Sequence, residues 1–119
     1  MSVIDDITRL KHMLQAAQQA VAFARGKART SLDEDTLLVF ALVRAIEIVG
    51  EAASRITPEF RATYPQIPWQ VIVGMRNVLV HAYFDVDLDI VWNTVTKNLP
   101  PLIVELQTLV NSIEKNGEG

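Results

Sequence analysis

The chain has 119 residues, half of them hydrophobic and only 7% aromatic, which suits one domain with an aliphatic core of packed helices. Its formal net charge of −3 argues against a broad basic surface for nucleic acid but permits a small local site. Cysteine is absent and the two histidines lie far apart, so we expect no disulfide, no metal site and no bound cofactor.

The first predicted helix covers about residues 3–24. Apolar side chains recur there at steps of four and three residues, and Gly26 is well placed to end the helix. The segment lacks the basic start and the continuous apolar run of a signal peptide, so we expect a cytoplasmic protein. A basic cluster follows at Arg25, Lys27 and Arg29, which we interpret as a solvated helix end rather than a binding site.

A second helix is predicted over about residues 33–55. Ser31 and Glu34 open it in the pattern of a capping box. From Leu37 to Val49 the helix is apolar almost all round, so it must be covered on more than one side. In a chain this small, a second copy of the chain is the obvious cover, and we therefore predict a homodimer.

Three charged residues form one stripe along this second helix, because Arg44, Glu47 and Glu51 are spaced by three and four residues. Arg44 and Glu47 also interrupt the longest apolar stretch, which therefore does not predict a membrane span. Two interpretations of the glutamates stay open. They support Arg76 from this helix, which we favour, or they pair only with Arg44 and Arg55.

The second half of the chain contains a connector and three further predicted helices. Thr57 and Pro58 can open a short helix within the proline-rich connector. The three longer helices cover about residues 68–84, 86–98 and 102–113, and Pro100 with Pro101 separates the last two. Nothing predicts a strand. We therefore predict an all-α fold, an antiparallel bundle of four to five helices over residues 1–116 with a disordered tail at 117–119.

The stretch RNVLVHAYF, residues 76–84, places four polar side chains in an otherwise apolar sequence: Arg76, Asn77, His81 and Tyr83. On a helical wheel, Val71 and Met75 fall on the side expected to face the core, whereas Arg76 falls on the opposite side. We therefore predict that the polar residues lie on a contact surface away from the core. Two copies of this surface around a twofold axis would gather two such sets in one cleft.

These residue types suit the cleavage of an RNA phosphodiester without a metal ion. Histidine titrates near neutrality and can take a proton from the 2′-hydroxyl or give one to the leaving oxygen. Arginine can grip the phosphate and stabilise transition-state charge, asparagine can orient either group, and tyrosine can stack on a base. The alternative is structural, with Glu47 or Glu51 as the partner of Arg76 at an interface, and periodicity alone favours it.

Four sequence blocks resemble the HEPN-domain ribonucleases of the HepT-like branch, and they occur in the family's order: GEAA, IPW, RN and H-x-Y-F. The resemblance implies a homodimeric, metal-independent endoribonuclease that acts as the toxin of a type VII-like toxin–antitoxin pair. Arg76 and His81 would be its catalytic pair, with Asn77 helping to position them. Its partner would be a minimal nucleotidyltransferase antitoxin (MntA-like), which neutralises such toxins by transferring AMP to the tyrosine at the position of Tyr83.

Two other interpretations stay open. A non-catalytic helical subunit that presents a substrate or a surface to a nucleotidyltransferase would bind its partner but cleave no RNA. A structural bundle whose polar cluster only fixes the register of a dimer agrees with the helical wheel, but it does not explain the matching blocks outside the motif.

Overall fold

The computed structural model describes the backbone of residues 3–81 and 87–118 and the side chains of residues 5–76 and 87–116. Within these ranges the regular secondary structure is entirely helical, which confirms the predicted all-α class. No helix of the described part is long and apolar enough to cross a membrane.

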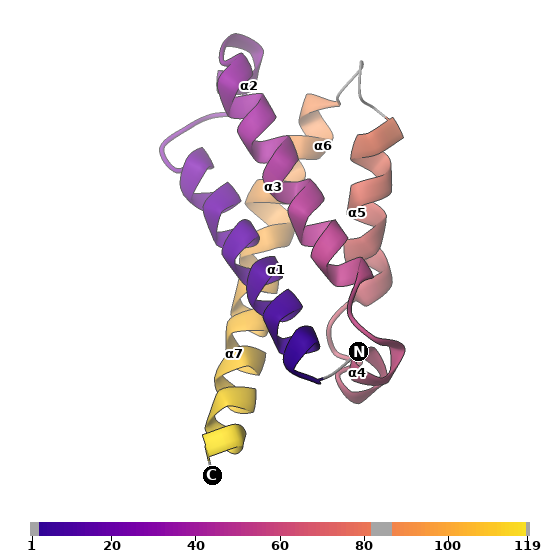
Figure 1. The fold of residues 1–119 in the computed structure, drawn as a ribbon. Helices are drawn as coiled ribbons and strands as arrows, with labels where there is room; N and C mark the ends of the chain where they lie inside the picture. Colours follow the sequence, from indigo (N-terminus) through magenta and orange to yellow (C-terminus); the bar gives the residue numbers. More distant parts are fainter. Residues whose placement is uncertain (1–2, 82–86, 119) are drawn as a thin grey trace.

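Four long helices make up the frame of the molecule: α1 (Val3–Ala24), α3 (Thr36–Ser54), α5 (Trp69–His81) and α7 (Leu99–Glu118). Shorter elements connect them: α2 (Ser31–Glu34), α4 (Pro58–Thr63), α6 (Leu88–Asn93) and the π-helical segment η1 (Thr94–Asn98). The described ranges thus hold seven α-helices, where we predicted four to five. Helix α3 packs between α1 and α5, and α7 packs against α1 (Figure 1). The chain runs in opposite directions in α3 and α5, so the start of α3 and the end of α5 lie at the same end of the molecule (Figure 1).

The core between these helices is aliphatic, as the composition predicted. Its largest fully buried side chains come from every long helix, from the α6–η1 region and from the connector between α4 and α5: Leu10, Met13, Leu42, Ile46, Val49, Ile67, Ile72, Val91, Val95, Leu99 and Leu106. Burial of such side chains supplies the main driving force for folding. The core therefore fixes the relative positions of α3 and α5, which carry the candidate site.

Two turn signals from the sequence are confirmed. Gly26 follows the end of α1 with φ +75°, a left-handed conformation that glycine adopts without steric cost. Thr57 caps α4, because its hydroxyl accepts a hydrogen bond from the N–H of Phe60 at 3.3 Å. Pro58 occupies the first turn of that helix, where its missing N–H is not needed.

The predicted start of the second long helix is wrong. Asp35 separates α2 from α3 in an extended conformation (φ −117°, ψ 90°), and its side chain accepts a hydrogen bond from the N–H of Leu38 at 3.0 Å. Asp35 rather than Ser31 is therefore the cap of the long helix. An aspartate in this position satisfies a backbone donor that the helix itself leaves unpaired, which stabilises the start of α3 four residues later than the capping-box pattern suggested.

The predicted break before Pro100 and Pro101 is also wrong, because both prolines lie in the first turn of α7. The N–H of Leu99 bonds to the carbonyl of Thr94, five residues earlier, which is the π-helical spacing. This wider turn joins α6 to α7. It lies just before Pro100 and Pro101, which have no backbone N–H to donate. Helix α7 then continues to Glu118.

Candidate functional site

Arg76 lies on the side of α5 that faces α3, not on the outer side that the helical wheel predicted. A Cβ atom added to Gly50 of α3 would lie 2.7 Å from the Cβ of Arg76 and 3.0 Å from its backbone nitrogen. Only glycine permits such a close approach, since it has no side chain. One turn earlier on α5, Ile72 is fully buried, whereas Val71, which we placed on the core side, is 64% exposed.

The orientation of α5 could not be read from hydrophobicity alone. Apolar residues occur on both sides of this helix, so the wheel offers two sides that could face the core. The contact at Gly50 determines the orientation, because it brings the backbones of α3 and α5 together at Arg76. From the sequence, we identified Gly50 only as part of the family block GEAA.

The guanidinium of Arg76 is held by Ser54 at the end of α3. Its Nη1 donates a hydrogen bond to the Oγ of Ser54 at 3.2 Å, and the Ser54 hydroxyl donates to the carbonyl of Glu51 at 2.6 Å. The contact uses one of the five N–H donors of a guanidinium, so it orients the group without exhausting it. We did not predict Ser54, although Gly50 and Ser54 are four residues apart and so share one helix face.

The charged stripe on α3 forms an ion-pair ladder centred on Arg44. Its Nη1 lies 3.6 Å from Glu47 Oε2 and 3.5 Å from Glu51 Oε1. Arg44 is thus the partner that the structure gives to both glutamates, while the hydrogen bond of Arg76 goes to Ser54. Glu51 still takes part in holding Arg76 indirectly, since its carbonyl accepts from the Ser54 hydroxyl.

The rest of the motif is described only in part. The backbone of Asn77 and His81 belongs to α5, so residues 76–81, the first six of the motif, lie on one helix. The side chains of Asn77 and His81, and all of Tyr83, lie outside the described residues. Among the side chains that are described, no group of three or more histidine, aspartate or glutamate residues is arranged to hold a metal ion.

An exposed apolar patch lies on α3, on the same helix as the ladder. Leu37 is 79% exposed and Phe40 is 68% exposed. Because α3 and α5 are antiparallel, this patch lies at the end of the molecule where α5 ends at His81 (Figure 1). Large apolar side chains exposed together are typical of surfaces that bind another protein.

Comparison with known proteins identifies the family. The family model described as "Ribonuclease HepT-like" matches residues 13–109 of this chain, which include all of α3 and α5. Gly50, Ser54 and Arg76 therefore lie within the matched region. No solved structure gives a significant match.

Curated relatives agree with the family match. A protein of Caldanaerobacter subterraneus subsp. tengcongensis named "Putative RNase" is 35% identical over 101 residues, which cover 85% of this chain and 90% of the relative. A "Putative RNase" of Methanocaldococcus jannaschii is 32% identical over 98 residues, 82% of this chain and 90% of the relative. The "Probable ribonuclease HepT" of Thermococcus cleftensis is 46% identical over 63 residues, 53% of this chain and 57% of the relative.

These matches confirm the resemblance that the sequence blocks indicated, together with the predicted enzyme class, ribonuclease. The contact of Gly50 with Arg76 links two of those blocks, GEAA and RN, in the folded chain. The chain belongs to the HepT-like ribonuclease family.

Proposed function

We propose that this protein is a toxin that cleaves RNA without a metal ion, with Arg76 and His81 as the catalytic pair and Asn77 positioning them. The observation that carries the proposal is the double anchoring of Arg76, whose backbone contacts Gly50 and whose guanidinium contacts Ser54. A catalytic arginine needs such a fixed position, since charge stabilisation depends on groups that are oriented before the reaction.

In the proposed reaction the 2′-oxygen of a ribose attacks the adjacent phosphorus and the bond from phosphorus to the 5′-oxygen breaks. The 2′-hydroxyl loses a proton and the leaving 5′-oxygen gains one, and histidine chemistry at His81 serves these transfers. Arg76 binds the phosphate oxygens on which negative charge accumulates. The products are a 2′,3′-cyclic phosphate and a 5′-hydroxyl, so atoms and charge balance without an oxidant or a reductant.

We further propose that two copies of the chain complete the site. The patch of Leu37 and Phe40 supports this, since burying two side chains that are 79% and 68% exposed favours association. The ladder of Arg44, Glu47 and Glu51 carries both signs of charge on the same helix, so a twofold axis can oppose unlike charges from two copies. A second copy also supplies a second histidine, which matters because Arg76 and His81 diverge by about 140° on a straight helix.

The proposed regulator is a minimal nucleotidyltransferase antitoxin that transfers AMP from ATP to the hydroxyl of Tyr83. In this step the tyrosine oxygen bonds to the α-phosphorus and pyrophosphate leaves. Tyr83 follows His81 by two residues, so the added nucleotide would bring bulk and negative charge close to the place of the RNA phosphate. The sequence motif supports this assignment, and intact-mass measurement before and after incubation with such a partner and ATP tests it.

The ribonuclease itself is tested with purified protein, a defined RNA and a metal chelator. We expect the wild type to produce cyclic phosphate ends and Arg76→Ala and His81→Ala to lose this activity. Lys11→Ala is the matched control, because it removes one cation and breaks the exposed 2.6 Å ion pair with Glu114, away from the α3–α5 contact. A wild-type protein that binds a nucleotidyltransferase but cleaves no RNA would instead favour the non-catalytic subunit.

A further inference from the structure

Helix α5 carries an apolar side that is only partly covered. The helix packs against α3, and its other side stands at the edge of the bundle (Figure 1). Val71 is 64% exposed there, and Met75, four residues later on the same face, is partly buried. Exposed apolar side chains that lie together are typical of surfaces that bind another molecule.

Two open grooves meet on this side of α5, at Pro68 and Val71. The first has a volume of about 400 Å³ and is lined by Arg61, by the connector between α4 and α5 and by the start of α5. The second has a volume of about 300 Å³ and lies between α5, as far as Met75, and the residues around Lys97, where η1 leads into α7. We call the two grooves together the Val71 surface.

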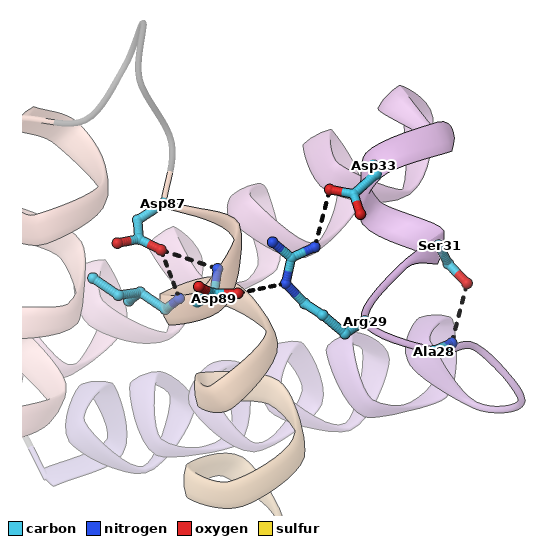
Figure 2. Close-up of polar contacts among 7 residues, drawn as sticks. Ala28, Arg29, Ser31, Asp33, Asp87 and Asp89 are labelled. Carbon is cyan, nitrogen blue, oxygen red and sulfur yellow. Dashed lines mark hydrogen bonds and ion pairs between the residues drawn. The ribbon is translucent and has the colours of Figure 1, made fainter.

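The charged residues described in the lining of the Val71 surface are both cations, Arg61 and Lys97. Other cations of the chain have carboxylate partners: Figure 2 shows the guanidinium of Arg29 between Asp33 and Asp89. None of the ion pairs in the described part of the chain includes Arg61 or Lys97. The chain as a whole has 14 acidic and 11 basic residues, so this lining runs against its overall charge. The surface therefore complements a molecule that brings its own negative charges.

RNA does not suit the Val71 surface, although it is negatively charged. RNA binding relies on a cation for each phosphate that it neutralises, and on exposed aromatic faces for stacking. The aromatic residue in the lining, Trp69, is only 6% exposed, and its indole N–H donates to the carbonyl of Tyr64 at 3.0 Å. Prolines and aliphatic side chains make up most of the lining, which suits the side chains of a protein.

A second copy of this chain does not suit the surface either. Around a twofold axis the same surface of both copies would meet, and no carboxylate among the described lining residues could face Arg61 or Lys97. The proposed dimer patch of Leu37 and Phe40 lies near the start of α3, whereas Val71 lies near the start of α5, at the opposite end of the molecule (Figure 1). The two surfaces can therefore be occupied at the same time.

We propose that the Val71 surface docks a partner protein, through a segment that carries acidic residues beside apolar ones. The inference rests on the proposed function, because it takes the nucleotidyltransferase regulator as that partner. Apolar side chains of the segment fill the grooves on either side of Val71, and its carboxylates face Arg61 and Lys97. Arg61 is already oriented, since its Nη2 donates to the carbonyl of Ala53 at 2.8 Å and its guanidinium has further donors. A partner held here lies against the helix that carries Arg76.

The experiment measures the rates at which the nucleotidyltransferase binds to and leaves this protein, by surface plasmon resonance at low and high salt. Val71→Glu should raise the dissociation rate about tenfold or more, because it places a charge between the two apolar grooves. Lys97→Glu should lower the association rate about tenfold at low salt and less at high salt, since a charge at the rim steers the encounter. Neither change should move the midpoint of thermal unfolding, because both side chains are exposed.

Phe23→Glu and Lys115→Glu are the matched controls. They make the same kinds of change at exposed positions, on α1 and at the far end of α7, outside the described lining of the Val71 surface. Both variants should bind the nucleotidyltransferase at wild-type rates.

Three results would overturn the inference. The first is wild-type binding rates in both Val71→Glu and Lys97→Glu. The second is a different occupant: a Val71→Glu protein that no longer dimerises assigns the surface to a second copy, and a raised KM for RNA in Lys97→Glu, without the partner, assigns it to RNA. The third is a wild type that cleaves RNA but binds no nucleotidyltransferase. A wild type that binds the partner through this surface but cleaves no RNA contradicts the proposed ribonuclease instead and leaves the docking surface in place.

Discussion

Gly50 of α3 and Arg76 of α5 lie so close that a methyl group on Gly50 would come within 2.7 Å of the Cβ of Arg76. The glycine therefore sets both the distance between the two helices and the side of α5 that α3 covers. Ser54, one turn further along α3, receives the guanidinium of the same arginine. One face of α3 thus holds the backbone and the charged group of Arg76 at once.

Gly50→Ala should lower the free energy of unfolding by about 1–3 kcal/mol, because the added methyl group overpacks the α3–α5 contact. It should also lower kcat, since Arg76 must move. Gly74→Ala is the matched control: a Cβ there meets no atom within 4 Å, so it should stabilise α5 by up to about 1 kcal/mol. Urea unfolding of both variants measures the contrast, and equal stabilisation by the two changes would contradict the account.

Ser54→Ala should lower kcat for RNA cleavage while changing the free energy of unfolding by only about 1 kcal/mol. The change removes the acceptor of the Arg76 guanidinium but leaves the close contact at Gly50 in place. Thr108→Ala serves as the control, because that hydroxyl also donates to a carbonyl of its own helix, at 2.8 Å, and lies on the exposed side of α7. Equal kcat values in Ser54→Ala and Thr108→Ala would exclude a role for the Ser54 contact.

The sequence predicted the parts of this fold that depend on local patterns. The extent of α1, the glycine turn after it and the Thr57 cap depend on periodicity and on single residue preferences. The motif residues Arg76 to His81 also lie on one helix as predicted. These features need no knowledge of the partner helix.

The features that the sequence did not predict depend on contacts between elements. Either of two apolar sides of α5 could face the core. The close contact between Gly50 and Arg76 determines which side does. The continuation of the helix past Pro100 depends on a π-helical turn, which the preferences of single residues do not predict. Arg29 donates a hydrogen bond to Asp89, sixty residues away in the sequence, and a local sequence pattern cannot predict such a contact.

Asp6→Ala should lower the free energy of unfolding by about 2–3 kcal/mol. This carboxylate is only 2% exposed and accepts hydrogen bonds from Thr57 N at 2.9 Å and Thr57 Oγ1 at 2.7 Å, which ties α1 to the cap of α4. Asp35→Ala, which removes an exposed carboxylate cap from α3, should cost only about 1 kcal/mol. Denaturant titration of the two variants measures how much free energy of unfolding each carboxylate contributes, one buried and one exposed. A smaller loss of free energy in Asp6→Ala than in Asp35→Ala would show that the contacts of Asp6 add little.

Phe40→Glu should weaken the proposed dimer by about tenfold or more, because it places a charge within an apolar contact surface. Val104→Glu is the control, since Val104 is similarly exposed, at 65% against 68% for Phe40, but lies on α7. Sedimentation equilibrium over a range of protein concentrations gives the dissociation constants. A monomeric wild type, or a Phe40→Glu protein that dimerises like the wild type, would exclude this patch as the dimer contact.

Induced expression without any partner protein tests the central claim most directly. Cells would carry the wild type, Arg76→Ala or His81→Ala at matched protein levels, and growth and the integrity of total RNA would be followed together. The account predicts growth arrest with RNA breakdown in the wild type alone. Equal growth and intact RNA in all three cultures, or arrest that persists in Arg76→Ala and His81→Ala, would contradict it.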